Sequence, residues 1–300
     1  MKLTQSIHTI ALLSCIGLAA LTTGCVTTDS TAASKFAASV TTVKSQANDA
    51  LNASAKLTRD EGIAYVATRP TLAEADFAET PTSDIITEWD ITLASIESYA
   101  LNLAALSSPD VTKDFDAAAT NLFNQFTQTA DRLSKNSLQS SAQTTAGLAA
   151  GFSEIAHLIL AAHAQASAHK IATATDPQIQ KVLNLLADEI GGDHVNPCLR
   201  TTVYRTWNTK KDALNESFLT ATNQAVKMVV AEQYADIMAK RAAQDESLLG
   251  LRRSLLALGD AHHALAQGND ISAQAALTIV TAELQRTHDL FNQFNSEIKK

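Results

Sequence analysis

Hydrophobic residues recur at intervals of three and four along almost the whole chain, and no stretch alternates apolar and polar residues as a strand does. Such spacing keeps the apolar side chains on one face of a helix. The first long example occupies residues 31–68, where Ser54 fills one place among Phe36, Val40, Val43, Ala47, Ala50 and Leu57. The pattern predicts an all-α fold.

Prolines, glycines and capping residues divide this pattern into eight predicted helices. They cover about 31–68, 83–106, 109–136, 138–174, 177–190, 197–243, 248–267 and 270–298. Three of the starts pair a polar cap with a proline, at Ser108-Pro109, Asp176-Pro177 and Asn196-Pro197. No clear stop separates the sixth and seventh segments, which leaves open one kinked helix. The predicted apolar stripe of the sixth segment is Leu214, Phe218, Ala221, Ala225, Met228 and Ala235.

Several of these helices exceed 35 residues, which corresponds to about 50 Å at 1.5 Å per residue. Helices of that length joined by short turns form elongated antiparallel bundles. Much of the 46% hydrophobic content is alanine, which lets helices approach closely but buries little area per residue. We therefore expect a single helical-bundle domain over residues 31–300, in which many helix–helix contacts each bury a small area.

The first 25 residues follow a different pattern. Lys2 is followed by an apolar run from Ile7 to Leu21, then by the small residues of 22–24 and by Cys25. A charged start, a short apolar run and small residues form a secretory signal, and the run is too short to span a membrane. This segment resembles the signal of a bacterial lipoprotein, although Thr22 stands where that motif usually has leucine.

The resemblance implies a signal peptide over 1–24, a lipid on Cys25 and a tether over 25–30. It also implies a location, because Gram-negative lipoproteins kept in the inner membrane usually have aspartate after the lipidated cysteine. Here that residue is Val26, so we expect an outer-membrane anchor facing the periplasm. A soluble periplasmic protein is the alternative.

Charge and cysteine content narrow the classes of partner. A net charge of −8 makes nucleic acid a poor partner, and the basic residues form no patch, since Lys210-Lys211 and Arg252-Arg253 are isolated pairs. Cys198 is the one cysteine after Cys25, so it has no internal disulfide partner. We expect Cys198 to be a buried thiol that acts as a small apolar residue.

Few residues point to chemistry, and no catalytic motif or cofactor-binding loop is present. Glu154 and His157 form an ExxH, the spacing with which helical bundles hold metals. Asp260 and His263 repeat that spacing on another predicted helix. These four residues are the weak candidates for a metal site, for which a solvated helix flank is the simpler interpretation.

Two polar residues continue the apolar stripes of their helices. Glu232 follows Met228 by four positions, and His262 follows Leu258 by four. A buried carboxylate needs a partner. We therefore expect Glu232 and His262 to be partly buried and hydrogen-bonded, and they could be bonded to each other. The alternative is that both lie at an end of the bundle that is open to water.

The most apolar later stretch is Ala146 to Ala168, with Gly147 and Gly151 spaced for close helix packing. Glu154 and His157 within it make membrane insertion costly, so we expect a buried helix. The sequence thus favours a non-enzymatic lipoprotein with a structural role or a protein partner in the cell envelope. A metal- or small-ligand-binding bundle and a membrane-active, pore-forming protein are the alternatives.

Overall fold

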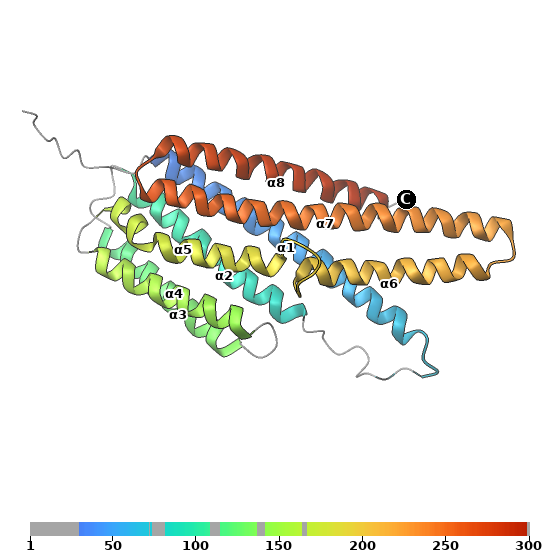
Figure 1. Ribbon diagram of the computed structural model, residues 1–300. Helices are drawn as coiled ribbons and strands as arrows, with labels where there is room; N and C mark the ends of the chain where they lie inside the picture. The colour runs from blue at the N-terminus through green and yellow to red at the C-terminus, as the bar shows by residue number, and fades with distance from the viewer. Residues whose placement is uncertain are drawn as a thin grey trace, which may run out of the picture.

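The computed structural model describes residues 30–71, 73, 82–108, 115–136, 142–163 and 167–298. Within these residues the chain forms eight α-helices and no strand, which confirms the all-α prediction (Figure 1). They are α1 (Ser30–Val66), α2 (Thr82–Leu106), α3 (Phe115–Asn136), α4 (Ala142–His163), α5 (Ala168–Ile190), α6 (Leu199–Thr220), α7 (Gln224–Ala266) and α8 (Asp270–Ile298).

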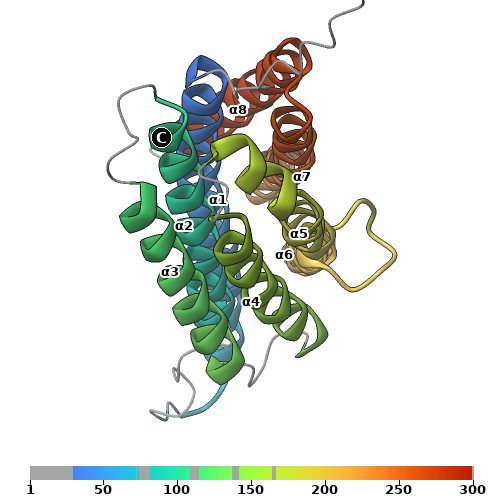
Figure 2. The same ribbon diagram turned by 90° about the vertical axis from the view of Figure 1, so that its left-hand side faces the viewer.

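The bundle is arranged around α7, which packs on α8, α5, α6 and α1. At 43 residues, α7 is about 65 Å long. The helices α3 and α4 pack on each other and join the rest through α2 and α5, so they lie on the side away from α8 (Figure 2). The hairpin of α6 and α7 reaches beyond every other helix at one end (Figure 1).

The predicted stripe of the first helix forms part of the core. Its six apolar residues are buried, and so is Ser54. The Ser54 hydroxyl donates to the carbonyl of Ala50 and accepts from Gln244 of α7 at 3.2 Å. Gln244 in turn accepts from the indole nitrogen of Trp207 at 2.7 Å. A serine on an apolar stripe is therefore the α1 partner of a buried polar chain through α6 and α7.

The boundary predicted at Asp176-Pro177 is wrong. Pro177 lies inside α5, which begins at Ala168, so the break from α4 comes earlier than expected. The proline is tolerated there although its ring removes one backbone hydrogen bond. Asp176 caps no helix in this arrangement, because its carboxylate bonds to α7 instead. The other early start, Ser108-Pro109, lies at the edge of the described residues.

The sixth and seventh predicted helices are divided in the wrong place. The chain breaks at residues 221–223, where the Asn223 side chain caps α7 by accepting from the amide of Ala225 at 2.8 Å. Everything from Gln224 to Ala266 is one helix. The predicted stripe at residues 214–235 is consequently not core: Phe218, Ala225, Met228 and Ala235 are exposed. Only a neighbouring helix can bury a stripe, and no third helix reaches this end of the α6–α7 hairpin.

The two glycines of the apolar stretch provide the contact between α4 and α5. A Cβ atom on Gly147 would lie 3.2 Å from Leu185, and one on Gly151 would lie 3.0 Å from Val182. Both neighbours belong to α5. The spacing therefore serves helix packing inside the bundle.

Replacing Gly151 by leucine should lower the free energy of unfolding by about 2 kcal/mol, because a well-packed contact cannot take four more carbon atoms. Chemical denaturation followed by circular dichroism measures the change. Gly62→Leu is the matched control, since a Cβ atom there meets nothing within 4 Å. Equal stability of the two variants would show that α4 and α5 are not packed through Gly151.

Candidate functional site

The four metal candidates do not come together. Glu154 and His157 are exposed on α4, while Asp260 and His263 are exposed on α7. The helix α5 packs on both α4 and α7, which separates the two pairs. In the described part of the chain no three His, Cys, Asp or Glu side chains are grouped as a metal would require. Glu154, His157 and Asp260 face solvent, and the His263 ring bonds to Asp176 instead.

The expected pair of Glu232 and His262 does not form. Both residues lie on α7, 30 positions apart, which is about 45 Å along the helix. Glu232 is exposed near the end of the hairpin, so the expectation of burial is wrong for it. His262 is fully buried, beyond the partial burial that was expected, and its partners come from other helices.

His262 lies at the centre of a buried polar network. Its Nδ1 is 2.8 Å from Oδ1 of Asp176 on α5, and its Nε2 is 2.7 Å from the hydroxyl of Tyr99 on α2. The Tyr99 hydroxyl is also 2.8 Å from Oγ1 of Thr175. From the opposite side, His263 places Nδ1 2.6 Å from Oδ2 of Asp176. The network joins α2, α5 and α7.

Aromatic packing encloses the network on the side of α1. The ring of Phe36 lies 5.6 Å from the His262 ring, centroid to centroid, and the Tyr99 ring lies 5.5 Å from it. Tyr99 also contacts Phe126 of α3. Residues from α1, α2 and α5 therefore surround the imidazole of α7, and α3 packs on Tyr99 behind it.

The protonation pattern follows from the donors and acceptors. An ionised carboxylate only accepts, so His262 and His263 must each carry hydrogen on Nδ1 to bond Asp176. Burial raises the pKa of Asp176, but the hydrogen bonds from His262 and His263 outweigh it and hold this pKa below its ordinary value. Burial also raises the pKa of Tyr99, which keeps its hydroxyl protonated.

This Asp–His–Tyr chain has the composition of an acid–base relay but not the access that catalysis needs. His262 and Tyr99 are both 0% exposed, so no substrate can reach them. The network has instead the properties of a structural device. Every member has a partner, and the geometry permits only one alignment of the helices it joins.

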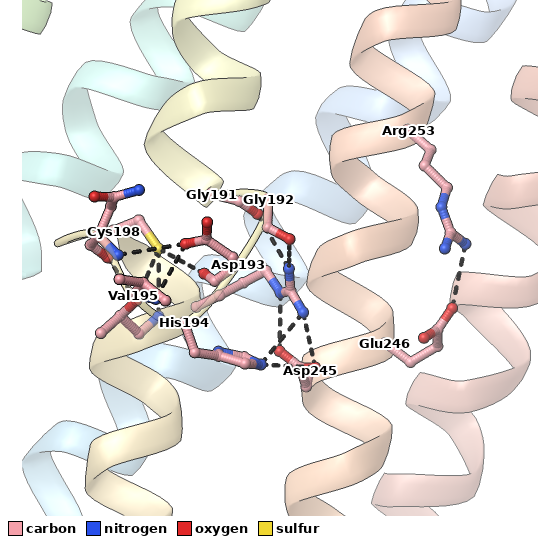
Figure 3. Close-up of polar contacts among 12 residues, drawn as sticks. Gly191, Gly192, Asp193, His194, Val195, Cys198, Asp245, Glu246 and Arg253 are labelled. Atoms are coloured by element: carbon pink, nitrogen blue, oxygen red, sulfur yellow. Dashed lines mark hydrogen bonds and ion pairs between the residues drawn. The ribbon is translucent and has the colours of Figure 1, made fainter.

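A second polar cluster fixes the loop between α5 and α6 (Figure 3). The buried guanidinium of Arg200 donates to both oxygens of Asp245 on α7, at 2.8 and 2.9 Å. It also donates to the carbonyls of Gly191 and Gly192, at 3.3 and 2.8 Å. The hydrogen bond and charge of Asp245 raise the pKa of Arg200. Arg200 therefore holds the base of the hairpin against the end of α5.

Cys198 belongs to the same loop and is half-buried rather than fully buried as expected. Its sulfur caps α6 by accepting from the amide of Thr201 at 3.4 Å. Gly191 packs directly on this sulfur and has a φ of 92°, where only glycine fits without strain. Cys198 is thus a capping residue at the start of the hairpin.

The far end of the hairpin carries a group of exposed apolar side chains. We define the hairpin tip as residues 217–231, from the last turn of α6 to the second turn of α7. Its large exposed side chains are Phe218, Leu219, Val226, Met228 and Val229. The tip has one charged residue, Lys227, whose ammonium group lies 5.3 Å from the Phe218 ring centroid. Soluble proteins rarely leave a contiguous group of large apolar side chains in water.

The apolar helix α4 contains a stretch, Thr144–Ala162, that is long and apolar enough to cross a membrane. Half of this stretch is buried inside the bundle, where α4 packs on α3 and α5. Helix packing therefore accounts for its apolar composition without a membrane.

Four features of the structure were missed from the sequence. The position of Asp176 before a proline predicts a helix cap, and no sequence pattern distinguishes Tyr99 or Arg200. The hairpin tip was assigned to the core because its spacing is that of a buried stripe. A possible signal was the pair His262-His263, since two adjacent histidines leave a helix about 100° apart and can both meet one carboxylate.

No family model, curated protein or solved structure matches this chain. The class that the fold and the site define is an all-α bundle with a buried polar centre and a projecting hairpin.

Proposed function

We propose that this protein is a lipid-anchored, periplasm-facing bundle with a structural or protein-interaction role in the bacterial envelope. The observation that carries the proposal is the projecting hairpin of α6 and α7, because a non-enzymatic bundle needs an exposed element with which to reach its target (Figure 1). The buried polar networks support a rigid body behind that element.

The anchor in this proposal comes from the N-terminal sequence. The segment 1–24 has the order of a lipoprotein signal, and Cys25 and Val26 follow it as in outer-membrane lipoproteins. Cys25 lies outside the described residues, so its modification stays a prediction. No observation favours the metal-binding alternative, since the four candidate ligands lie apart.

The Cys25→Ala protein should lose its membrane association in the source cells, because it has no thiol to receive lipid. Fractionation of the cells and mass spectrometry of the purified protein test this. The expected results are a lipid-sized mass on Cys25 in the wild type and, in the variant, no such mass and nearly complete transfer to the soluble fraction. Cys198→Ala is the matched control and should stay with the membrane. A soluble wild type without added mass would contradict the anchor.

A further inference from the structure

The hairpin tip is more apolar, and apolar over a wider arc, than packing on one neighbour requires. On α7, the exposed residues Val226, Met228 and Val229 span about 160° of the helix circumference at 100° per residue. A helix that packs on one neighbour needs a stripe of roughly 100°. Phe218 and Leu219 add a second apolar surface on α6. A fluid apolar phase can cover all these surfaces at once, whereas a single groove cannot.

The length of the apolar part suits shallow insertion into one leaflet. From Gln224 to Val229, α7 rises about 7.5 Å, and interfacial elements enter a bilayer by about 5–10 Å. Beyond this depth the surface is polar on both helices, with exposed Glu216 on α6 and exposed Glu232 on α7. These two carboxylates set a limit to the depth.

Charge also distinguishes the tip from the rest of the molecule. The chain has a net charge of −8, yet the only charge within residues 217–231 is positive, on Lys227. An anionic membrane would therefore repel the body and attract the tip, and the molecule would approach tip first. The contact with the Phe218 ring keeps the Lys227 ammonium group beside the apolar surface. When that surface enters a bilayer, the ammonium group would lie at the level of the lipid phosphates.

A second copy of the chain fits the tip less well. The five large side chains are 37–71% exposed, which gives roughly 500 Å² of surface per copy, against about 800 Å² per partner in a stable interface. We propose that the hairpin tip inserts into the surface of an anionic lipid bilayer.

This membrane contact lies far from the proposed anchor. Phe36, near the start of α1, lies against His262, and His262 is 36 residues, or about 54 Å, from Val226 along α7. Cys25 is five residues from Ser30, a reach of at most about 18 Å. This step rests on the proposed lipid on Cys25. The lipid and the tip would then contact membranes at opposite ends of the bundle, so one molecule could bridge two membrane surfaces.

The test uses the chain from Val26 to Lys300, which keeps every described helix and lacks Cys25, so its outcome is independent of the anchor. Vesicles of phosphatidylethanolamine and phosphatidylglycerol are sedimented with this protein. We expect the wild type to bind and Leu219→Gln/Met228→Gln to bind at least tenfold more weakly with unchanged circular dichroism. Ile271→Gln/Ile279→Gln, at 85% and 56% exposed positions of α8, is the matched control and should bind like the wild type.

A tryptophan at the tip tests insertion directly. The two native tryptophans, Trp89 and Trp207, are buried, so brominated lipids should quench only an introduced ring that enters the bilayer. We expect quenching of Leu219→Trp and none of Ile271→Trp. The proposal is overturned if the wild type does not bind vesicles or if the control loses as much binding as the tip variant. Equal quenching of the introduced tryptophans in Leu219→Trp and Ile271→Trp would also overturn it. If the wild type sediments as a dimer without binding vesicles, and Leu219→Gln/Met228→Gln sediments as a monomer, the tip contacts a second copy of the chain instead.

Discussion

Replacing Asp176 by asparagine is expected to lower the free energy of unfolding by about 3 kcal/mol at pH 7. The reason is that the change removes a buried carboxylate that accepts two hydrogen bonds. An amide has one acceptor oxygen, so one of the two Nδ1–H groups of His262 and His263 would face an NH₂ group. Chemical denaturation measures the difference. The matched control is Asp260→Asn, an exposed carboxylate two residues before His262, which should change stability by less than about 0.5 kcal/mol.

The effect of Asp176→Asn should depend on pH in a direction that the pKa of Asp176 sets. This pKa is lowered in the folded protein, while the unfolded value is about 3.9. The contribution of the carboxylate is then fully present above about pH 5 and is lost as pH falls through the folded pKa. The stability difference between wild type and variant should shrink below about pH 4. A difference that stayed constant from pH 7 to pH 3 would contradict an ionised Asp176 in the network.

Arg200→Met is expected to lower the free energy of unfolding by about 2 kcal/mol. The substitution keeps an aliphatic chain but leaves the Asp245 carboxylate and the carbonyl of Gly192 without their guanidinium donor. We expect less than the loss for a fully buried pair, because the Asp245 side chain is 26% exposed and water can replace part of the donor.

Hydrogen exchange locates the effect of Arg200→Met. The amides of residues 191–198 should exchange faster, since Arg200 ties this loop to α7. Arg205→Met is the matched control, because Arg205 is exposed on the same helix. Equal stability of the two variants, or faster exchange spread over all helices, would show that Arg200 does not fix the hairpin base.

Both predictions concern polar groups that hold long helices in register. An alanine-rich bundle buries little area per residue, so apolar contacts alone leave neighbouring helices free to slide by one turn at small cost. The Asp176–His262–Tyr99 chain and the Arg200–Asp245 pair each have one geometry that satisfies all donors and acceptors. We infer that they specify the alignment that places the hairpin beyond the rest of the bundle.

The sequence by itself determined the all-α fold, most helix positions and the core face of the first helix. Helical periodicity is a local property, so residues such as Phe36, Val40 and Leu57 could be assigned to one face without knowledge of their neighbours. The same local information identified His262 as buried, because it continues a stripe of leucines. Capping chemistry was a weaker guide, since Asp176-Pro177 has the form of a helix start and lies inside α5.

Only the tertiary structure decided which polar residues meet and which apolar residues stay in water. Asp176 and His262 are 86 residues apart, and their contact depends on the packing of α5 on α7, which no local pattern encodes. Phe218 and Met228 have the spacing of core residues, yet they are exposed because no third helix reaches the end of the hairpin. Burial is a property of the neighbours that a face finds, and those neighbours are set by the whole fold.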